Sequence, residues 1–157
     1  MYNHEPQNYS CPFCRIIERA QLQTIQTSDV IYSSEAVTAF LALRRWTYNP
    51  VDILIVPNDH FENIFDLPAS CALDIHQVTR AVAFSMKAVY QCDGISTRQH
   101  NEPAGDQDVW HYHVHITPRF TDDHFYRSQK VAFPEQERLE HAKRLRESLQ
   151  ERPLQLF

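Results

Sequence analysis

Glycine is nearly absent from this chain of 157 residues, which contains only Gly94 and Gly105. Phosphate-binding loops of the P-loop type and of the dinucleotide-fold type need several glycines close together, so that the backbone can approach the phosphate. The chain therefore excludes both loop types. Any bound phosphate must instead be held by side chains or by a loop that flanks a strand.

Positive charge and long apolar runs are also scarce. The formal net charge of −5 argues against a protein that a general positive field holds on nucleic acid, and it suits a compact anionic ligand better. No segment approaches the length of a membrane span, and polar residues 1–10 lack the basic and apolar regions of a signal peptide. We therefore expect no nucleic acid polymer and no membrane as partners, and a cytoplasmic location.

Of the four cysteines, only Cys11 and Cys14 are closely spaced. Nothing points to secretion, so reduced thiols are expected rather than disulfides. Two thiolates at C-x-x-C spacing can bind one zinc ion, but a structural zinc site needs four ligands, and histidine is the natural supplier of the other two. His60 and His111 are the candidates. The alternative is a pair of buried or redox-active cysteines without metal.

Three histidines alternate with other residues in the segment Trp110-His111-Tyr112-His113-Val114-His115-Ile116-Thr117. Because successive side chains of a strand point to opposite faces, the three rings are expected on one face of a single strand. Imidazolium charges this close repel one another, and buried rings need hydrogen-bond partners. The stripe therefore predicts either a metal site or a catalytic surface.

The remaining patterns predict one compact α+β domain. Strands are expected at residues 29–33, 36–41, 53–57, 95–99 and 109–117, with loops at 44–52 and 100–108. Helices are expected at 12–20, 69–91 and 134–150. The long central helix should stop at Asp93-Gly94, where glycine can adopt the left-handed cap conformation. This order predicts a mainly antiparallel sheet with the helices on one side.

Taken together, the motifs resemble those of the histidine triad (HIT) family. The pattern His-φ-His-φ-His-φ-φ, where φ is apolar, matches residues 111–117, and Cys-Pro-Phe-Cys-Arg-Ile-Ile at 11–17 resembles the opening of many bacterial members. Further matches are Leu-Ile-Val-Pro at 54–57 and Gln-His-Asn-Glu-Pro-Ala-Gly at 99–105. The resemblance implies an HIT-like fold over residues 11–126. Residues 1–10 are expected to be a disordered lead, and residues 127–157 a C-terminal helical extension packed on the same domain.

The resemblance implies hydrolysis or nucleotidyl transfer at the α-phosphate of a small nucleotide substrate, by a homodimer. His113 would attack phosphorus and carry the nucleotide as a covalent phosphoramidate. His115 would lie beside the phosphate, while Asn101 and Gln107 would bind the phosphate region through hydrogen bonds. Arg119 is a further candidate for phosphate binding. Nucleoside phosphoramidates and dinucleoside polyphosphates are the candidate substrates.

The same resemblance implies that Cys11, Cys14, His60 and His111 bind zinc. A Cys₂His₂ shell is closed and leaves no position for an activated water, so this zinc would be structural. It would attach the N-terminal segment to the histidine segment and orient the neighbouring rings.

Three features depart from the family pattern. Ala42 stands where many members carry an acidic residue that contacts ribose, and residues 50–52 read Pro-Val-Asp where Pro-Gly-His is frequent. Asp108 replaces a serine or threonine near the phosphate. A carboxylate there would repel phosphate unless a cation such as Arg44 or Arg119 pairs with it.

Two other functions stay open. One is a nucleotide-binding regulatory module with little turnover, which Ala42 and Asp108 favour. The other is a metal-dependent hydrolase in which all three triad histidines share a catalytic ion. The spread of three alternate residues along a strand, about 13–14 Å over two pleat repeats, disfavours this hydrolase.

Overall fold

The structure is a computed structural model that describes residues 2–21 and 29–151. Its elements in chain order are α1 (Pro12–Gln21), β1 (Val30–Ser33), β2 (Val37–Leu41), β3 (Arg44–Trp46), β4 (Ile53–Pro57), α2 (Ala69–Tyr90), β5 (Gly94–Gln99), the 3-10 helix η1 (Pro103–Gly105), β6 (Val114–Arg119), the 3-10 helix η2 (Phe125–Arg127), β7 (Lys130–Ala132) and α3 (Glu135–Glu151). Among these described elements, no helix combines the length and the apolar character needed to cross a membrane.

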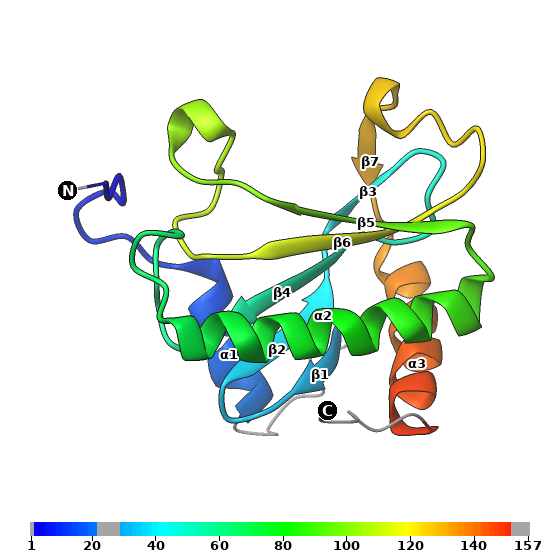
Figure 1. Ribbon diagram of the computed structural model, residues 1–157, viewed down its shortest axis with the longest axis horizontal. Coiled ribbons are helices and arrows are strands. Elements are labelled where there is room, and N and C mark those ends of the chain that lie inside the picture. The colour runs from blue at the N-terminus through cyan, green and yellow to red at the C-terminus, as the bar shows by residue number, and fades with distance from the viewer. Residues whose placement is uncertain (1, 22–28, 152–157) are drawn as a thin grey trace.

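Five strands form one antiparallel sheet in the order β1-β2-β4-β6-β5. Figure 1 shows α2 running along this sheet, while the η1 loop and β7 rise at opposite ends of β5 and β6. The predicted α+β class with a mainly antiparallel sheet and a long central helix is confirmed.

Both faces of the sheet are covered, and β4 shows why. All five of its residues are buried. Ile53 and Ile55 pack in the same core cluster as Val82 of α2, whereas Leu54 packs in a second cluster with Phe13 of α1. The expectation that all helices lie on one side is therefore wrong for α1, because a strand that is apolar on both faces needs a cover on each.

A second sheet pairs β3 with β7, and the sequence patterns missed both strands. Arg44 pairs with Ala132, and Trp46 with Lys130, although residues 44–52 were expected to be a loop. Arg44 and Lys130 are 86 positions apart. Two three-residue strands joined over such a distance leave no local pattern, and adjacent arginines do not have the composition of a strand.

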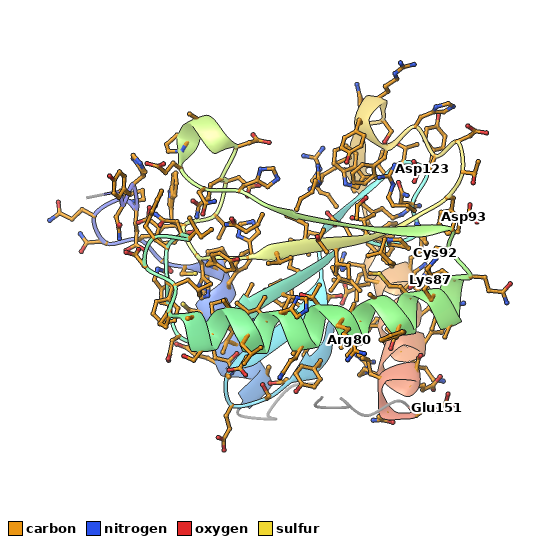
Figure 2. All side chains as sticks on the ribbon, viewed as in Figure 1. Arg80, Lys87, Cys92, Asp93, Asp123 and Glu151 are labelled. Atoms are coloured by element: carbon orange, nitrogen blue, oxygen red, sulfur yellow. The ribbon has the colours of Figure 1, made fainter. Side chains whose placement is uncertain are left out.

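The end of α2 also differs from the prediction. The left-handed residue is Gln91, with φ of 51°, and its N–H donates to the carbonyl of Lys87. Gly94 is already the first residue of β5, and no described glycine has a positive φ. The Lys87 ammonium donates to the carbonyl of Cys92 at 2.7 Å, and Figure 2 labels both residues at this end of the helix. The connection between α2 and β5 is thus held by contacts with Lys87 in the last turn of α2, and not by a glycine.

The histidine segment enters the sheet later than predicted. The strand was expected at 109–117, but β6 begins at Val114, so only His115 of the three histidines lies in it. The N–H of Tyr112 donates to the carbonyl of Phe61, and the N–H of His111 donates to that of Val109. These hydrogen bonds connect the backbone before β6 to loops instead of to a neighbouring strand. The prediction that all three histidines lie along one strand is therefore wrong.

The N-terminal lead forms neither a helix nor a strand over residues 2–10, yet it is attached to the domain. The carboxylate of Glu62 accepts the N–H groups of His4 and Glu5. The Asn63 side chain donates to the carbonyl of Tyr2 at 2.8 Å. The lead was expected to be disordered, and these hydrogen bonds hold it against the turn after β4.

The C-terminal segment packs α3 against the same core. Ala142 and Leu145 of α3 are fully buried in the cluster that α2 also lines. The guanidinium of Arg138 pairs with Asp29 just before β1, at 2.9 Å. Because α3 packs against both α2 and β1, it covers the sheet at its β1 edge.

A buried carboxylate, Asp123, organises the turn after β6 (Figure 2). It accepts two hydrogen bonds from the Arg119 guanidinium, at 2.7 and 2.8 Å, and one from the Asn49 amide at 2.8 Å. The backbone N–H groups of Phe120 and Phe125 also donate to it. The hydrogen bonds from Arg119 hold the pKa of Asp123 below its ordinary range.

We predict that Asp123→Ala lowers the free energy of unfolding by about 2–3 kcal/mol, because it leaves buried donors without an acceptor. The lowered pKa means that the ionised carboxylate stabilises the fold above the ordinary pKa of about 3.9, and that this stabilisation decreases as the pH falls below that value. Urea unfolding at pH 7 and pH 3 measures both effects. Glu35→Ala, in the exposed turn between β1 and β2, is the control, and an equal loss in the two variants would contradict the prediction.

Candidate functional site

The site is centred on His113, which lies immediately before β6 and is 2% exposed. Its ring stands 5.1 Å from the ring of His115, centroid to centroid, and 5.3 Å from that of Phe13 in an edge contact. The last contact comes from α1 on the second face of the sheet. Helix α1, which was expected on the same side of the sheet as the other helices, thus shields His113 from water.

The hydrogen bonds of His113 define which of its nitrogens is available. Nδ1 lies 2.7 Å from the carbonyl oxygen of His111, and a carbonyl can only accept, so Nδ1 carries the proton. Nε2 is therefore the nitrogen with a free lone pair. Burial, assisted by the nearby His115, lowers the pKa of His113 from its ordinary 6.5 to about 4. The ring is therefore uncharged at neutral pH.

His115 is held by a carboxylate that sequence reasoning did not assign to the site. Asp52 is fully buried, and its Oδ2 lies 3.1 Å from Nδ1 of His115. Its Oδ1 accepts the hydroxyl of Thr117 at 2.8 Å, and Lys130 approaches to 3.3 Å. Burial alone would raise the pKa of Asp52, but its contacts with His115, Lys130 and Thr117 together lower it.

One signal in the sequence indicated Asp52. It replaces the histidine of the frequent Pro-Gly-His and precedes the apolar run Ile53-Leu54-Ile55-Val56. A carboxylate next to a buried strand needs a hydrogen-bonded partner of opposite charge or a donor. What the sequence did not indicate is that this partner is His115, 63 positions away.

Asp108 lies beside His113 instead of facing an arginine. Its side chain is 84% exposed, and Oδ1 is 3.9 Å from Nε2 of His113. The two arginines proposed as its partners are engaged elsewhere. Arg119 pairs with Asp123, and Arg44 donates to the carbonyl of Lys130. Arg119 ends β6, four positions beyond His115.

The two predicted amide side chains lie in the loop that precedes the triad. The Gln107 amide is buried, and its nitrogen donates to the carbonyls of Glu62 and Val109. Asn101 exchanges hydrogen bonds with Gln99 and accepts the N–H of Ile64. In the structure both amides hold the loop in place, so their predicted role at the phosphate stays a prediction.

The four predicted metal ligands come together in one cluster. Cys14 Sγ lies 3.2 Å from Nδ1 of His60 and 3.6 Å from Nδ1 of His111, and Cys11 Sγ lies 3.4 Å from the same nitrogen of His111. The four ligand atoms are all within 4.8 Å of one another. Tetrahedral zinc, with bonds of about 2.0–2.3 Å, places its ligand atoms about 3.3–3.8 Å apart.

The outer nitrogens of both histidines are already bound to acceptors. Nε2 of His111 faces the carbonyl of Pro57 at 2.9 Å, and Nε2 of His60 faces the Glu5 carboxylate at 2.7 Å. Each ring thus donates through Nε2 and turns the lone pair of Nδ1 toward the cysteines. A carbonyl or carboxylate behind a histidine is the usual arrangement around a metal ligand. The donor set therefore fits a metal ion.

The fold and the site together define the class of protein. It is an α+β protein in which a neutral, buried imidazole lies just before a strand of the antiparallel sheet, beside a second imidazole that a carboxylate holds. The HIT domain family matches residues 14–122, and the chain belongs to this family. The protein hit of Bacillus subtilis is 29% identical over 111 residues, which cover 71% of this chain and 72% of that protein.

Solved structures share the same fold. A Hit-like protein involved in cell-cycle regulation from Bartonella henselae has a TM-score of 0.75 and 26% identity, over 91% of this chain and all of that one. A Zn-bound histidine triad family protein from Mycobacterium smegmatis has a TM-score of 0.74 and 23% identity, over 90% and 94% of the two chains. The diadenosine triphosphate hydrolase of Plasmodium falciparum has a TM-score of 0.71 and 17% identity, over 97% and 90%.

We predict that His113 stays uncharged, with its proton on Nδ1, down to about pH 5, because burial lowers its pKa to about 4. Two-bond ¹H–¹⁵N correlation spectra of ¹⁵N-labelled protein distinguish the two tautomers and the imidazolium. The spectrum of His113→Gln assigns the signal. Protonation with a midpoint near the ordinary value of 6.5, or a proton on Nε2, would contradict the geometry described above.

Proposed function

We propose that the protein is a nucleotide hydrolase or nucleotidyl transferase that acts at an α-phosphate through a covalent nucleotidyl-histidine on His113. The observation that carries this proposal is the hydrogen bond from Nδ1 of His113 to the carbonyl of His111 at 2.7 Å. This bond places the proton on Nδ1 and aims an unprotonated Nε2 outward from a buried ring.

The reaction proceeds in two displacements. Nε2 of His113 forms a bond to phosphorus as the bond from phosphorus to the leaving group breaks, and the leaving group departs with the electron pair. The ring then carries positive charge, which the carbonyl of His111 stabilises through the Nδ1–H bond. In the second displacement a water molecule, or another acceptor, attacks phosphorus and gives its proton to Nε2 of His115, which has passed its own proton to the leaving group. The electron pair of the N–P bond returns to Nε2 of His113.

His115 supports both displacements from the adjoining pleat. Its Nδ1 faces Asp52 at 3.1 Å, so this carboxylate orients the ring and leaves Nε2 on the side of the ring opposite Asp52. From there the ring donates to a phosphate or leaving-group oxygen when it is protonated. Asp52 does not touch the substrate in this scheme and acts as a positioning residue for His115.

Membership of the HIT family supports a nucleotide hydrolase or transferase, and one protein of the same fold is a diadenosine triphosphate hydrolase. The homodimer and the cytoplasmic location expected from the sequence stay predictions.

We also propose that Cys11, Cys14, His60 and His111 hold a structural zinc ion. The support is the donor set, the close approach of its four ligand atoms and the Zn-bound relative of the same fold. Bound zinc would supply a fixed link between α1 and the segment before β6. Because the carbonyl of the ligand His111 holds His113, the cluster would affect catalysis through position alone.

A regulatory module with little turnover is the second candidate, and one observation favours it. The Asp108 carboxylate stands 3.9 Å from Nε2 of His113, where it repels an approaching phosphate. The alternative of three histidines around one catalytic ion has less support. Both ring nitrogens of His111 face other groups, the Pro57 carbonyl on one side and the cysteines on the other.

We predict that His113→Ala reduces hydrolysis of diadenosine polyphosphates and adenosine phosphoramidate by at least about 10³-fold, because it removes the nucleophile. Initial rates are measured by product chromatography, and the wild-type adduct is trapped by rapid quenching without acid and located by mass spectrometry. His76→Ala, on the exposed side of α2, is the control. Turnover that survives His113→Ala but stops with a chelator would contradict the proposal, and substrate binding without any turnover in the wild type would favour the module.

We predict that Cys14→Ser lowers bound zinc from about one ion per chain to a small fraction and lowers Tm by several degrees, because a structural metal contributes directly to folding. Atomic absorption and thermal unfolding measure the two effects. Cys71→Ser, on α2 and outside the cluster, should leave both unchanged. Wild-type protein purified with zinc in the medium but without stoichiometric zinc would contradict the metal assignment.

A further inference from the structure

Arg98 of β5 is the direct neighbour of His115 across the sheet. The two residues are paired in the antiparallel register of β5 and β6. Residues directly opposite in an antiparallel pair point to the same face, with Cβ atoms about 4.5–5.5 Å apart. The arginine therefore emerges beside the second catalytic histidine, on the face where the proposed reaction takes place.

The guanidinium of Arg98 lies over aromatic rings and, among the described residues, has no hydrogen-bond acceptor. It lies 4.8 Å from the ring centroid of Trp46 and 4.9 Å from that of Phe125. Over residues 2–21 and 29–151 it makes no hydrogen bond or ion pair, and its buried Nε is without a partner. The other partly buried arginines all donate to oxygen acceptors, and these are Arg45, Arg119, Arg138 and Arg146.

A second cation reaches the same aromatic surface. Lys130 Nζ lies 5.3 Å from the ring centroid of Trp46 and 3.3 Å from Asp52. We name Arg98, Lys130, Trp46 and Phe125 the Arg98 cluster. Lys130 and His115 both pair with Asp52, and Arg119, which also lies over Phe125, pairs with Asp123. Within the described residues, the charge of Arg98 alone in this group has no paired carboxylate. In the part of the chain that the structure describes, the buried indole N–H of Trp46 is a further donor without a partner.

Charge of the opposite sign lies on the other side of the nucleophile. Asp108 is beside Nε2 of His113 and is largely exposed, whereas the Arg98 cluster adjoins His115, the next residue along the same face. An anionic chain that extends from the reacting phosphorus is repelled by Asp108 and attracted toward Arg98. The two ends of the site thus impose a direction on a charged substrate.

We propose that the Arg98 cluster binds a second phosphate of the substrate, in addition to the one that His113 attacks. A guanidinium that is weakly hydrated and held over aromatic rings presents its outer N–H groups in the fork that matches phosphate oxygens. The inference rests on the proposed function, and it narrows the substrate class to nucleotides with two phosphate groups. A nucleoside phosphoramidate with an uncharged leaving group leaves the cluster unused.

The second phosphate has two possible sources, a polyphosphate chain or a phosphorylated ribose. ADP and adenosine 3′,5′-bisphosphate represent them, and AMP is the reference with one phosphate. Binding of the three probes is measured by isothermal titration calorimetry with His113→Ala, so that turnover does not interfere. The double variant with Arg98→Met tests the cluster. His113→Ala with Arg127→Met, an exposed arginine of η2, is the control.

We expect at least one two-phosphate probe to bind more tightly than AMP in the reference protein. Arg98→Met should weaken that probe by about 10- to 100-fold and AMP by less than about threefold, since a lost charged hydrogen bond has this effect. The probe that loses affinity identifies the source of the second phosphate. Arg98→Lys keeps the charge but not the planar fork. Its affinity for that probe should lie between the affinities of the reference protein and of the Arg98→Met variant.

An equal loss for all three probes, or no loss for any, would overturn the inference. If Arg98→Met fails to fold, as judged by circular dichroism, Arg98→Gln replaces it under the same criteria. Failure of the proposed function is a separate result. If the wild type shows no turnover but prefers two-phosphate probes through Arg98, the proposed binding site stands and the proposed enzymatic function fails. If turnover depends on His113 but that preference is absent, the enzymatic function stands and the inference about Arg98 fails.

Discussion

The hydrogen bond from the ring of His113 to the carbonyl of His111 is the constraint on which the rest of the site depends. It selects the tautomer of the proposed nucleophile and fixes the direction of Nε2. The residue that supplies the carbonyl is itself held on both ring nitrogens, by Pro57 and by the thiols of Cys11 and Cys14. One backbone segment therefore joins the proposed metal cluster to the proposed chemistry, and this is possible because the segment has not yet entered the sheet.

Burial and charge act together around this bond. Phe13 of α1 covers His113 on one side, and removal from water keeps the imidazole neutral. His115, on the next pleat, instead meets a buried carboxylate. Two neighbouring histidines consequently have different surroundings, and these surroundings, more than the residue type, distinguish the roles proposed for them. The pairing of β3 with β7 adds charged and aromatic groups on the His115 side, because it brings Lys130 to Asp52 and Trp46 to Arg98.

The sequence predicted the features that depend on local pattern and motif spacing. The central helix follows from apolar residues at three- and four-residue steps, and the Cys11-Cys14 pair with His60 and His111 follows from ligand chemistry and family resemblance; the structure brings all four together. The errors have a common cause. The start of β6, the position of α1 and the strands β3 and β7 each depend on partners distant in the chain, which leave no periodic signal.

By itself, the sequence determined the family, the class of fold and the residue types available for chemistry, because these depend on composition, period and motif order. Only the tertiary structure decided how those residues are used. Asp52 was visible as a departure from a motif, yet its partner His115 lies 63 positions away. Arg98 was one charge among many, until the register of β5 and β6 placed it beside that histidine. Contacts between distant segments set the protonation, direction and charge of a site, and those contacts form only when the sheet does.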